Sequence, residues 1–122
     1  MVGITSIGIH IPFYMLAREL ISKAWNSRSI GGQKSVANYD EDSITMAVEA
    51  ASSCLNSQGR QDIDSIFFCS TTSPYKEKQC SAIVATASDL KRDILTCDLA
   101  NSLRAGSSGL RLAIDSVKSG SA

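Results

Sequence analysis

The groups of this chain that could support catalysis lie where a predicted strand runs into a predicted helix. An apolar run from Ile94 to Leu99 is followed by a short polar turn, and a helical pattern begins at Leu103. A helix N-terminus offers unpaired N–H groups and the positive end of the helix dipole, which lower the pKa of a cysteine thiol and can hold an oxyanion. Leu103 itself has an alkyl side chain and supplies no nucleophile.

Other reactive side chains are few. His10 is the only histidine, and the four cysteines contain no C-x-x-C pair, so we expect neither a metal site nor a Ser–His–Asp triad. Most of the cysteines lie in apolar stretches, where a buried, reduced thiol is the usual state. Cys97 has two interpretations, a buried strand residue or a displaced nucleophile. The cysteines are Cys54, Cys69, Cys80 and Cys97.

Composition limits the classes of function. Twelve acidic residues balance twelve basic ones, so charge favours neither nucleic acid nor an anionic membrane as a partner. The apolar runs fall short of the roughly 20 residues that span a bilayer. The N-terminus lacks the basic and long apolar regions of a signal peptide. We therefore expect a cytoplasmic protein with no membrane and no nucleic-acid partner.

The helices and strands around this junction are predicted from hydrophobic periodicity and from the glycine and proline residues that interrupt it. Strands and helices alternate, which predicts an α/β layered fold with a largely parallel sheet. The acidic triplet Asp40–Asp42 is interpreted as the start of a helix, with metal binding as the alternative. The expected strands are 2–11, 63–70 and 94–100, the expected helices are 15–25, 40–59, 79–90 and 103–119, and the expected loops are 26–38 and 71–78.

Several short motifs, in this order and at these spacings, resemble the thiolase superfamily, most closely the archaeal-type hydroxymethylglutaryl-CoA synthases. One loop, Ser70–Pro74, is rather more similar to ketoacyl synthase III. The resemblance implies a layered thiolase-like half-fold with a mostly parallel or mixed central sheet and flanking helices. The motifs are Met1–Ile4 with Ile11-Pro12, Lys34–Val36, Val48–Ala51, Ser73–Tyr75, Asp98-Leu99, Ala105-Gly106 and Val117–Gly120.

The resemblance also shows where this chain departs from the family pattern. The family's nucleophilic cysteine corresponds to Leu103, and the acid/base glutamate of the synthase branch corresponds to Thr71. A threonine hydroxyl cannot shuttle protons near neutral pH as a tuned carboxylate does. The resemblance therefore implies that no catalytic residue is intact.

Coenzyme A is the ligand that the resemblance implies, as a thioester and not as a resident cofactor. The segment between Trp25 and Lys34 is shorter than in the family, where this region helps to hold coenzyme A. Arg28, Lys34 and Arg104 are therefore the candidate binding residues. Other basic residues could bind its phosphates or could be solvated surface charges, and these are Lys76, Lys78, Lys91 and Arg92.

Family members have two similar halves, and residues 1–122 correspond to a single incomplete N-terminal thiolase-like domain. Thiolase-type folds dimerise through a core strand near the nucleophile helix. The resemblance thus implies a chain that is non-catalytic alone and acts in a homo- or hetero-oligomer with a thiolase-like partner chain. The alternatives are a fragment of an active acyl-CoA condensing enzyme, an acyltransferase completed by a longer chain or complex, and a decayed gene product.

Overall fold

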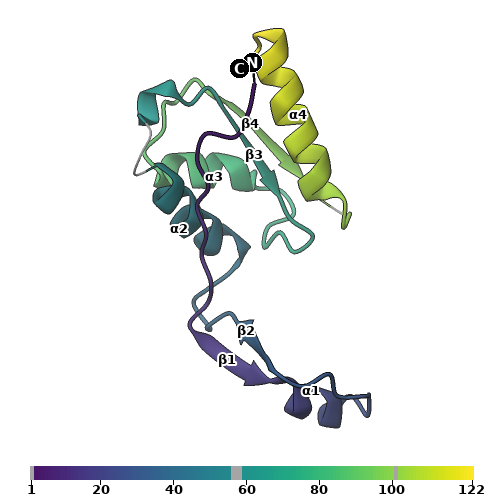
Figure 1. The fold of residues 1–122 in the computed structure, drawn as a ribbon. Coiled ribbons are helices and arrows are strands. Elements are labelled where there is room, and N and C mark those ends of the chain that lie inside the picture. Colours follow the sequence, from purple (N-terminus) through teal and green to yellow (C-terminus); the bar gives the residue numbers. More distant parts are fainter. Residues whose placement is uncertain (1, 56–58, 101) are drawn as a thin grey trace. The chain divides into compact units, whose positions relative to one another are not determined.

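The computed structural model describes residues 2–55, 59–100 and 102–122 (Figure 1). The chain divides into two compact units. Unit 1 comprises Met1–His10 and Ser43–Ala122, and unit 2 comprises Ile11–Asp42. Each unit has its own pair of strands, and each is described by itself below.

Unit 1 is built on two parallel strands, β3 (Ser65–Cys69) and β4 (Leu95–Leu99). Ser65 lies opposite Leu95 and Cys69 lies opposite Leu99, so both strands end at the same edge of the sheet. Aromatic and apolar residues dominate β3, as expected for a strand covered on both faces. A 3₁₀ helix, η1 (Arg60–Asp62), precedes β3. The predicted strands 63–70 and 94–100 are confirmed within two residues.

Helices cover both faces of this sheet (Figure 1). The helices α2 (Ser43–Leu55) and α3 (Cys80–Ala87) share a core with Ile66 and Phe68 of β3. Because side chains alternate between the faces of a strand, Cys69 points to the opposite face. The fully packed core consists of Ile44, Phe68, Cys80 and Val84, with Ala47, Val48, Ala51, Ile66 and Ile83 against it.

The helix α4 (Ala105–Ser119) packs on that opposite face. A Cβ built on Gly109 would overlap the Sγ of Cys69 and would lie 3.5 Å from Cδ1 of Leu99. Only a residue without a side chain allows this close approach of helix and sheet. The helix ends at Gly120, whose φ of 73° places it in the left-handed region that glycine favours.

Unit 2 contains two antiparallel strands, β1 (Tyr14–Ala17) and β2 (Gln33–Val36), with Tyr14 opposite Val36. The short helix α1 (Arg18–Ala24) follows β1 directly. The Arg18 N–H donates to the Gly32 carbonyl at 2.9 Å, which joins the start of the helix to the turn before β2. The unit therefore forms a hairpin whose connection carries a helix.

Two element predictions were wrong, and a third, the helix 15–25, was right for Arg18–Ala24 only. Residues 2–11 form no strand: Gly8 packs closely against the backbone of Ala50 and Cys54, and the Ser6 hydroxyl donates to the Cys54 carbonyl at 3.0 Å. This segment therefore packs against α2 instead of pairing as a strand. Its two glycines also weaken the strand preference that the alternating pattern suggested. The predicted helix 15–25 begins as β1, and the predicted loop 26–38 contains β2, because antiparallel pairing of the two segments overrides local propensity.

The layered α/β fold with parallel and antiparallel strands is confirmed, and α2, α3 and α4 lie within the predicted helices 40–59, 79–90 and 103–119. The acidic triplet lies just before α2, whose first turn carries no acidic residue. None of the described helices has the length and apolarity needed to cross a membrane.

Candidate functional site

The carboxyl ends of β3 and β4 bring two predicted site positions to one edge of the sheet. The Ser70 N–H donates to the Leu99 carbonyl at 3.0 Å, which extends the pairing by one residue. Thr71 follows in an exposed bend, and Leu103 lies in the turn that enters α4, with 97% of its surface exposed. The predicted strand-to-helix junction is therefore present, and the alkyl side chain of Leu103 is exposed to solvent there.

Ser102 holds the turn before α4 through two hydrogen bonds. The Ser102 hydroxyl accepts the Arg104 N–H at 3.1 Å, and the Ser102 carbonyl accepts the Ala105 N–H at 3.0 Å. Among the residues that the structure describes, no side chain caps the start of α4 by a hydrogen bond. The N–H groups of Arg104 and Ala105 are thus bonded within the turn, and the two predicted site positions hold an alkyl group, at Leu103, and a hydroxyl, at Thr71.

Unit 2 holds the other predicted binding residues. Arg28 and Lys34 line one pocket of about 420 Å³. Arg18, which was not among the predicted residues, lines the same pocket. It is the first residue of α1, and its N–H bond to the Gly32 carbonyl brings it close to the segment that carries the other two cations. The described lining residues include three cations and no carboxylate, which suits a phosphate. The full lining is Arg18, Ile21, Ser22, Ser27, Arg28, Ile30 and Lys34.

Similarity to known proteins extends along almost the whole chain. It is 39% identical to a hydroxymethylglutaryl-CoA synthase of Methanosphaera stadtmanae over 129 residues, which cover 98% of this chain and 37% of that protein. It is 35% identical to the corresponding protein of Methanocaldococcus jannaschii, with the same coverage. The chain is thus similar in sequence to hydroxymethylglutaryl-CoA synthases over almost its whole length. It spans 37% of the length of these two relatives.

Solved structures show the thiolase-like fold of this synthase-like chain. MvaS in complex with 3-hydroxy-3-methylglutaryl coenzyme A superimposes with a TM-score of 0.84 at 20% identity, covering 98% of this chain and 31% of that one. The 3-oxoacyl-(acyl carrier protein) synthase III of Pseudomonas aeruginosa PAO1 gives 0.78 at 20% identity, covering 94% and 37%. No protein-family model matches the chain.

Two cysteines lie in the strands that lead to this junction, and the Sγ of Cys69 packs against α4 at Gly109. Cys97 is in the middle of β4, opposite Phe67, and its thiol lies 3.9 Å from the Asp98 carbonyl. Burial, with a smaller contribution from Cys97, raises the pKa of the Cys69 thiol. A raised pKa reduces the thiolate fraction, so Cys69 is not poised for attack. The position of Cys97 in β4 favours the strand interpretation, and its side chain is half-buried. All four cysteines are free thiols.

A residue that the sequence analysis quoted only as part of a motif, Asp98, caps a helix. Its carboxylate accepts the N–H groups of Cys80 at 2.6 Å and Ser81 at 2.8 Å, the first two residues of α3. Burial by itself would raise the pKa of Asp98, but hydrogen bonds from Ser81 and Cys80 outweigh it and lower that pKa. Burial and the nearby Asp98 raise the pKa of the Cys80 thiol. Asp98 is thus a structural carboxylate that ties β4 to α3.

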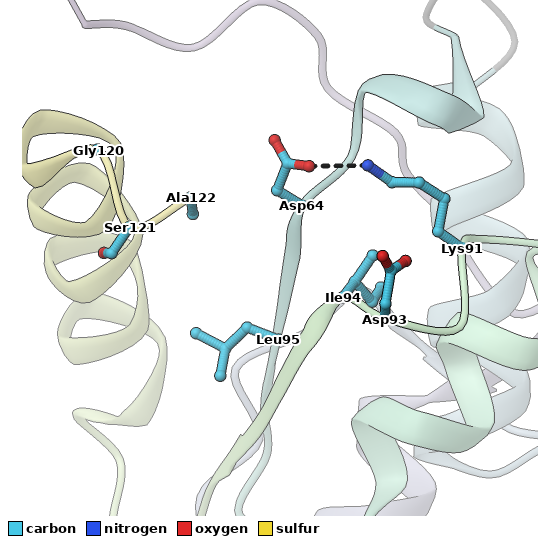
Figure 2. A pocket seen from close by; sticks show the side chains of 8 residues that line it. All are labelled: Asp64, Lys91, Asp93, Ile94, Leu95, Gly120, Ser121 and Ala122. Atoms are coloured by element: carbon cyan, nitrogen blue, oxygen red, sulfur yellow. Dashed lines mark hydrogen bonds and ion pairs between the residues drawn. The ribbon is translucent and has the colours of Figure 1, made fainter.

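The other basic candidates have local contacts of their own. Figure 2 shows a pocket of about 360 Å³ at the amino ends of β3 and β4, where the Lys91 ammonium lies 2.8 Å from the Asp64 carboxylate. The Lys78 ammonium lies 5.0 Å from the centre of the Tyr75 ring. Lys91 therefore lies at the amino ends of the strands, in contact with a carboxylate, whereas Leu103 follows the carboxyl end of β4.

Proposed function

We propose that this chain is a non-catalytic, acyl-CoA-binding subunit on a hydroxymethylglutaryl-CoA synthase-like scaffold. The observation that carries the proposal is the exposed alkyl side chain of Leu103 at the strand-to-helix junction, where the family resemblance places a cysteine. The exposed Thr71 follows the neighbouring strand, where the resemblance places a glutamate. Condensation needs both a nucleophile and a tuned acid, and neither Leu103 nor Thr71 supplies one.

The ligand that we propose is coenzyme A or one of its thioesters. The pocket of unit 2 supports this choice, since Arg18, Arg28 and Lys34 can each donate to a phosphate oxygen. Exposed cations bind phosphate with a strong dependence on salt, because surface charges are screened over roughly 10 Å at 0.1 M ionic strength. In unit 1, Arg104 at the entry to α4 is a second place where an anionic group of the ligand can bind.

Replacing both Arg28 and Lys34 with alanine is expected to weaken coenzyme A binding about tenfold, because two charge-assisted hydrogen bonds are lost. Lys23→Ala is the matched control, since Lys23 is an exposed cation of α1 outside the pocket lining. Isothermal titration calorimetry at low salt measures both. Equal affinity of the double variant and the wild type would remove the pocket from the proposal.

The non-catalytic role is tested by mass spectrometry after incubation with acetyl-CoA. We expect no acetyl adduct on the wild type and no condensation by Leu103→Cys, because the partner residues of the nucleophile are still absent. An exposed thiol at position 103 is expected to react with iodoacetamide, as is the control Leu110→Cys on α4, so accessibility is verified independently. Turnover by the Leu103→Cys variant would contradict the proposal.

The coverage of the relatives favours a second candidate function. Because the chain spans 37% of their length, it can represent part of a condensing enzyme that a further polypeptide completes. Mixing the wild-type chain with the part of the Methanosphaera stadtmanae protein that this chain does not match separates the candidates. Condensation by the mixture supports the second candidate, whereas formation of an inactive complex supports the first.

We further propose that the chain works in an oligomer with a thiolase-like partner, formed along β4. The strand is paired with β3 on one side only, among the residues that the structure describes. An edge strand carries a row of backbone donors and acceptors that can pair with another strand. This geometry supports association through β4.

A further inference from the structure

Three serines lie in or beside the cation pocket of unit 2, and their hydroxyls differ in accessibility. The Ser22 hydroxyl is buried and lies 2.8 Å from the Arg18 carbonyl oxygen and 3.2 Å from that of Glu19. The Ser29 hydroxyl accepts the Gly31 N–H at 3.2 Å, and Ser29 is exposed but outside the pocket lining. The first hydroxyl is therefore inaccessible, and the second lies beside the pocket.

Ser27 combines exposure with a place in the pocket lining. It lies in the loop between α1 and β2 (Figure 1). The backbone of this loop is held, because the Ser27 N–H donates to the Ser22 carbonyl at 2.9 Å and the preceding Asn26 has a left-handed φ of 47°. The loop therefore fixes an exposed hydroxyl at the wall of the pocket.

The groups around Ser27 would attract a phosphate attached to its hydroxyl. Arg18 of α1, Arg28 of the loop and Lys34 of β2 line the same pocket, and its described lining contains no carboxylate. A phosphoserine carries about −1.5 to −2 charges at pH 7 and three strong acceptor oxygens, which guanidinium groups bind well. A phosphate on Ser27 would thus neutralise much of the positive charge of the pocket.

We propose that Ser27 is a phosphorylation site whose phosphate closes the cation pocket to coenzyme A. This regulation rests on the coenzyme A pocket of the proposed function. The same three cations would hold either a phosphate of the ligand or the phosphate of Ser27. The tethered phosphate has an effective concentration on the order of millimolar, so it competes well with a dissolved ligand. Modification and coenzyme A binding therefore exclude each other.

The modifying reaction is the transfer of a phosphoryl group from ATP, catalysed by a protein kinase. The Ser27 oxygen forms a bond to the γ-phosphorus, and the bond between that phosphorus and the oxygen of ADP breaks. The hydroxyl proton passes to the catalytic base of the kinase, and ADP leaves. Lys23 and Arg28 flank Ser27 in the sequence, so a kinase that prefers basic substrate segments can recognise this loop.

The test uses phosphoserine inserted during translation. Ser27→phosphoserine is compared with the wild type, and Ser29→phosphoserine is the matched control outside the pocket lining. In calorimetric titrations at low salt, coenzyme A is expected to bind Ser27→phosphoserine about tenfold more weakly than the wild type. The control is expected to stay within about threefold of the wild type, because its charge acts only through screening solvent.

Phosphorus NMR gives a second readout that needs no ligand. Neighbouring cations favour the dianion, so the phosphate on Ser27 is expected to titrate at lower pH than the phosphate on Ser29, whose second pKa stays at about 6. Adding Lys34→Ala to Ser27→phosphoserine should move the titration back toward that of the control. Identical titration of the two phosphates would show that the cations do not hold the Ser27 phosphate, and would overturn the proposal.

Modification of the natural protein is tested by peptide mass spectrometry of the chain purified from its own cells with phosphatase inhibitors. A phosphate on Ser27 is expected, and its absence from repeated preparations would overturn the proposal. Failure of the proposed function gives a different pattern. A wild type without measurable coenzyme A binding overturns both the pocket and its regulation, whereas wild-type binding that Ser27→phosphoserine leaves unchanged overturns the regulation alone.

Discussion

Replacing Gly109 with alanine is expected to destabilise unit 1 by about 1–3 kcal/mol, the range typical of overpacking a core. The new methyl group would overlap the Sγ of Cys69, and Leu99 closes the other side of the space. Either the Cys69 side chain must rotate or helix α4 must move away from the sheet, and both changes cost packing energy. Urea denaturation followed by circular dichroism measures the change in the free energy of unfolding.

Two comparison variants isolate the cause. Gly106→Ala, on the same helix with no atom within 4 Å of the added group, is expected to stabilise the chain by about 0.5–1 kcal/mol through helix propensity. Combining Gly109→Ala with Cys69→Ala removes the sulfur that the methyl group meets, so most of the lost stability returns relative to Cys69→Ala alone. A Gly109→Ala protein as stable as the wild type would show that α4 does not pack on Cys69.

Replacing Asp98 with asparagine is expected to cost about 1–3 kcal/mol at pH 7, because two backbone N–H groups of α3 lose a charged acceptor. The loss falls on the contact between β4 and α3. Asp93→Asn, at an exposed aspartate just before β4, is the matched control and should change stability by less than about 0.5 kcal/mol.

The effect of Asp98 depends on pH with a definite sign. Its pKa in the folded chain is lowered, so its contribution is fully present above the unfolded-state value of about 3.9 and is lost as the pH falls through the lower folded-state value. Unfolding curves of wild type and Asp98→Asn should therefore stay apart from pH 7 to 5 and converge at lower pH. A gap that persists undiminished at pH 2 would assign the loss to packing instead of charge.

The sequence by itself determined the strand-to-helix junction that ends at α4. Apolar runs such as Ile94–Leu99 and helical periodicities are local signals. Here the folded chain keeps the secondary structure that they predict. The same local reasoning placed Leu103 at the junction and so argued against a nucleophile there. Arg28 and Lys34 could be nominated only through the family resemblance, and their roles await the binding experiment.

Only the tertiary structure decided which distant residues meet. The pairing of β1 with β2, the close approach of Gly109 to Cys69, the Asp98 cap and the Gln79–Thr96 bonds each join residues well apart in sequence. Arg18 likewise joins the cation pocket through a turn that carries no periodic signal. Hydrophobic periodicity shows which face of a helix or strand is apolar. The partner of that face depends on backbone pairing and side-chain packing across the whole chain, so a local pattern cannot predict it.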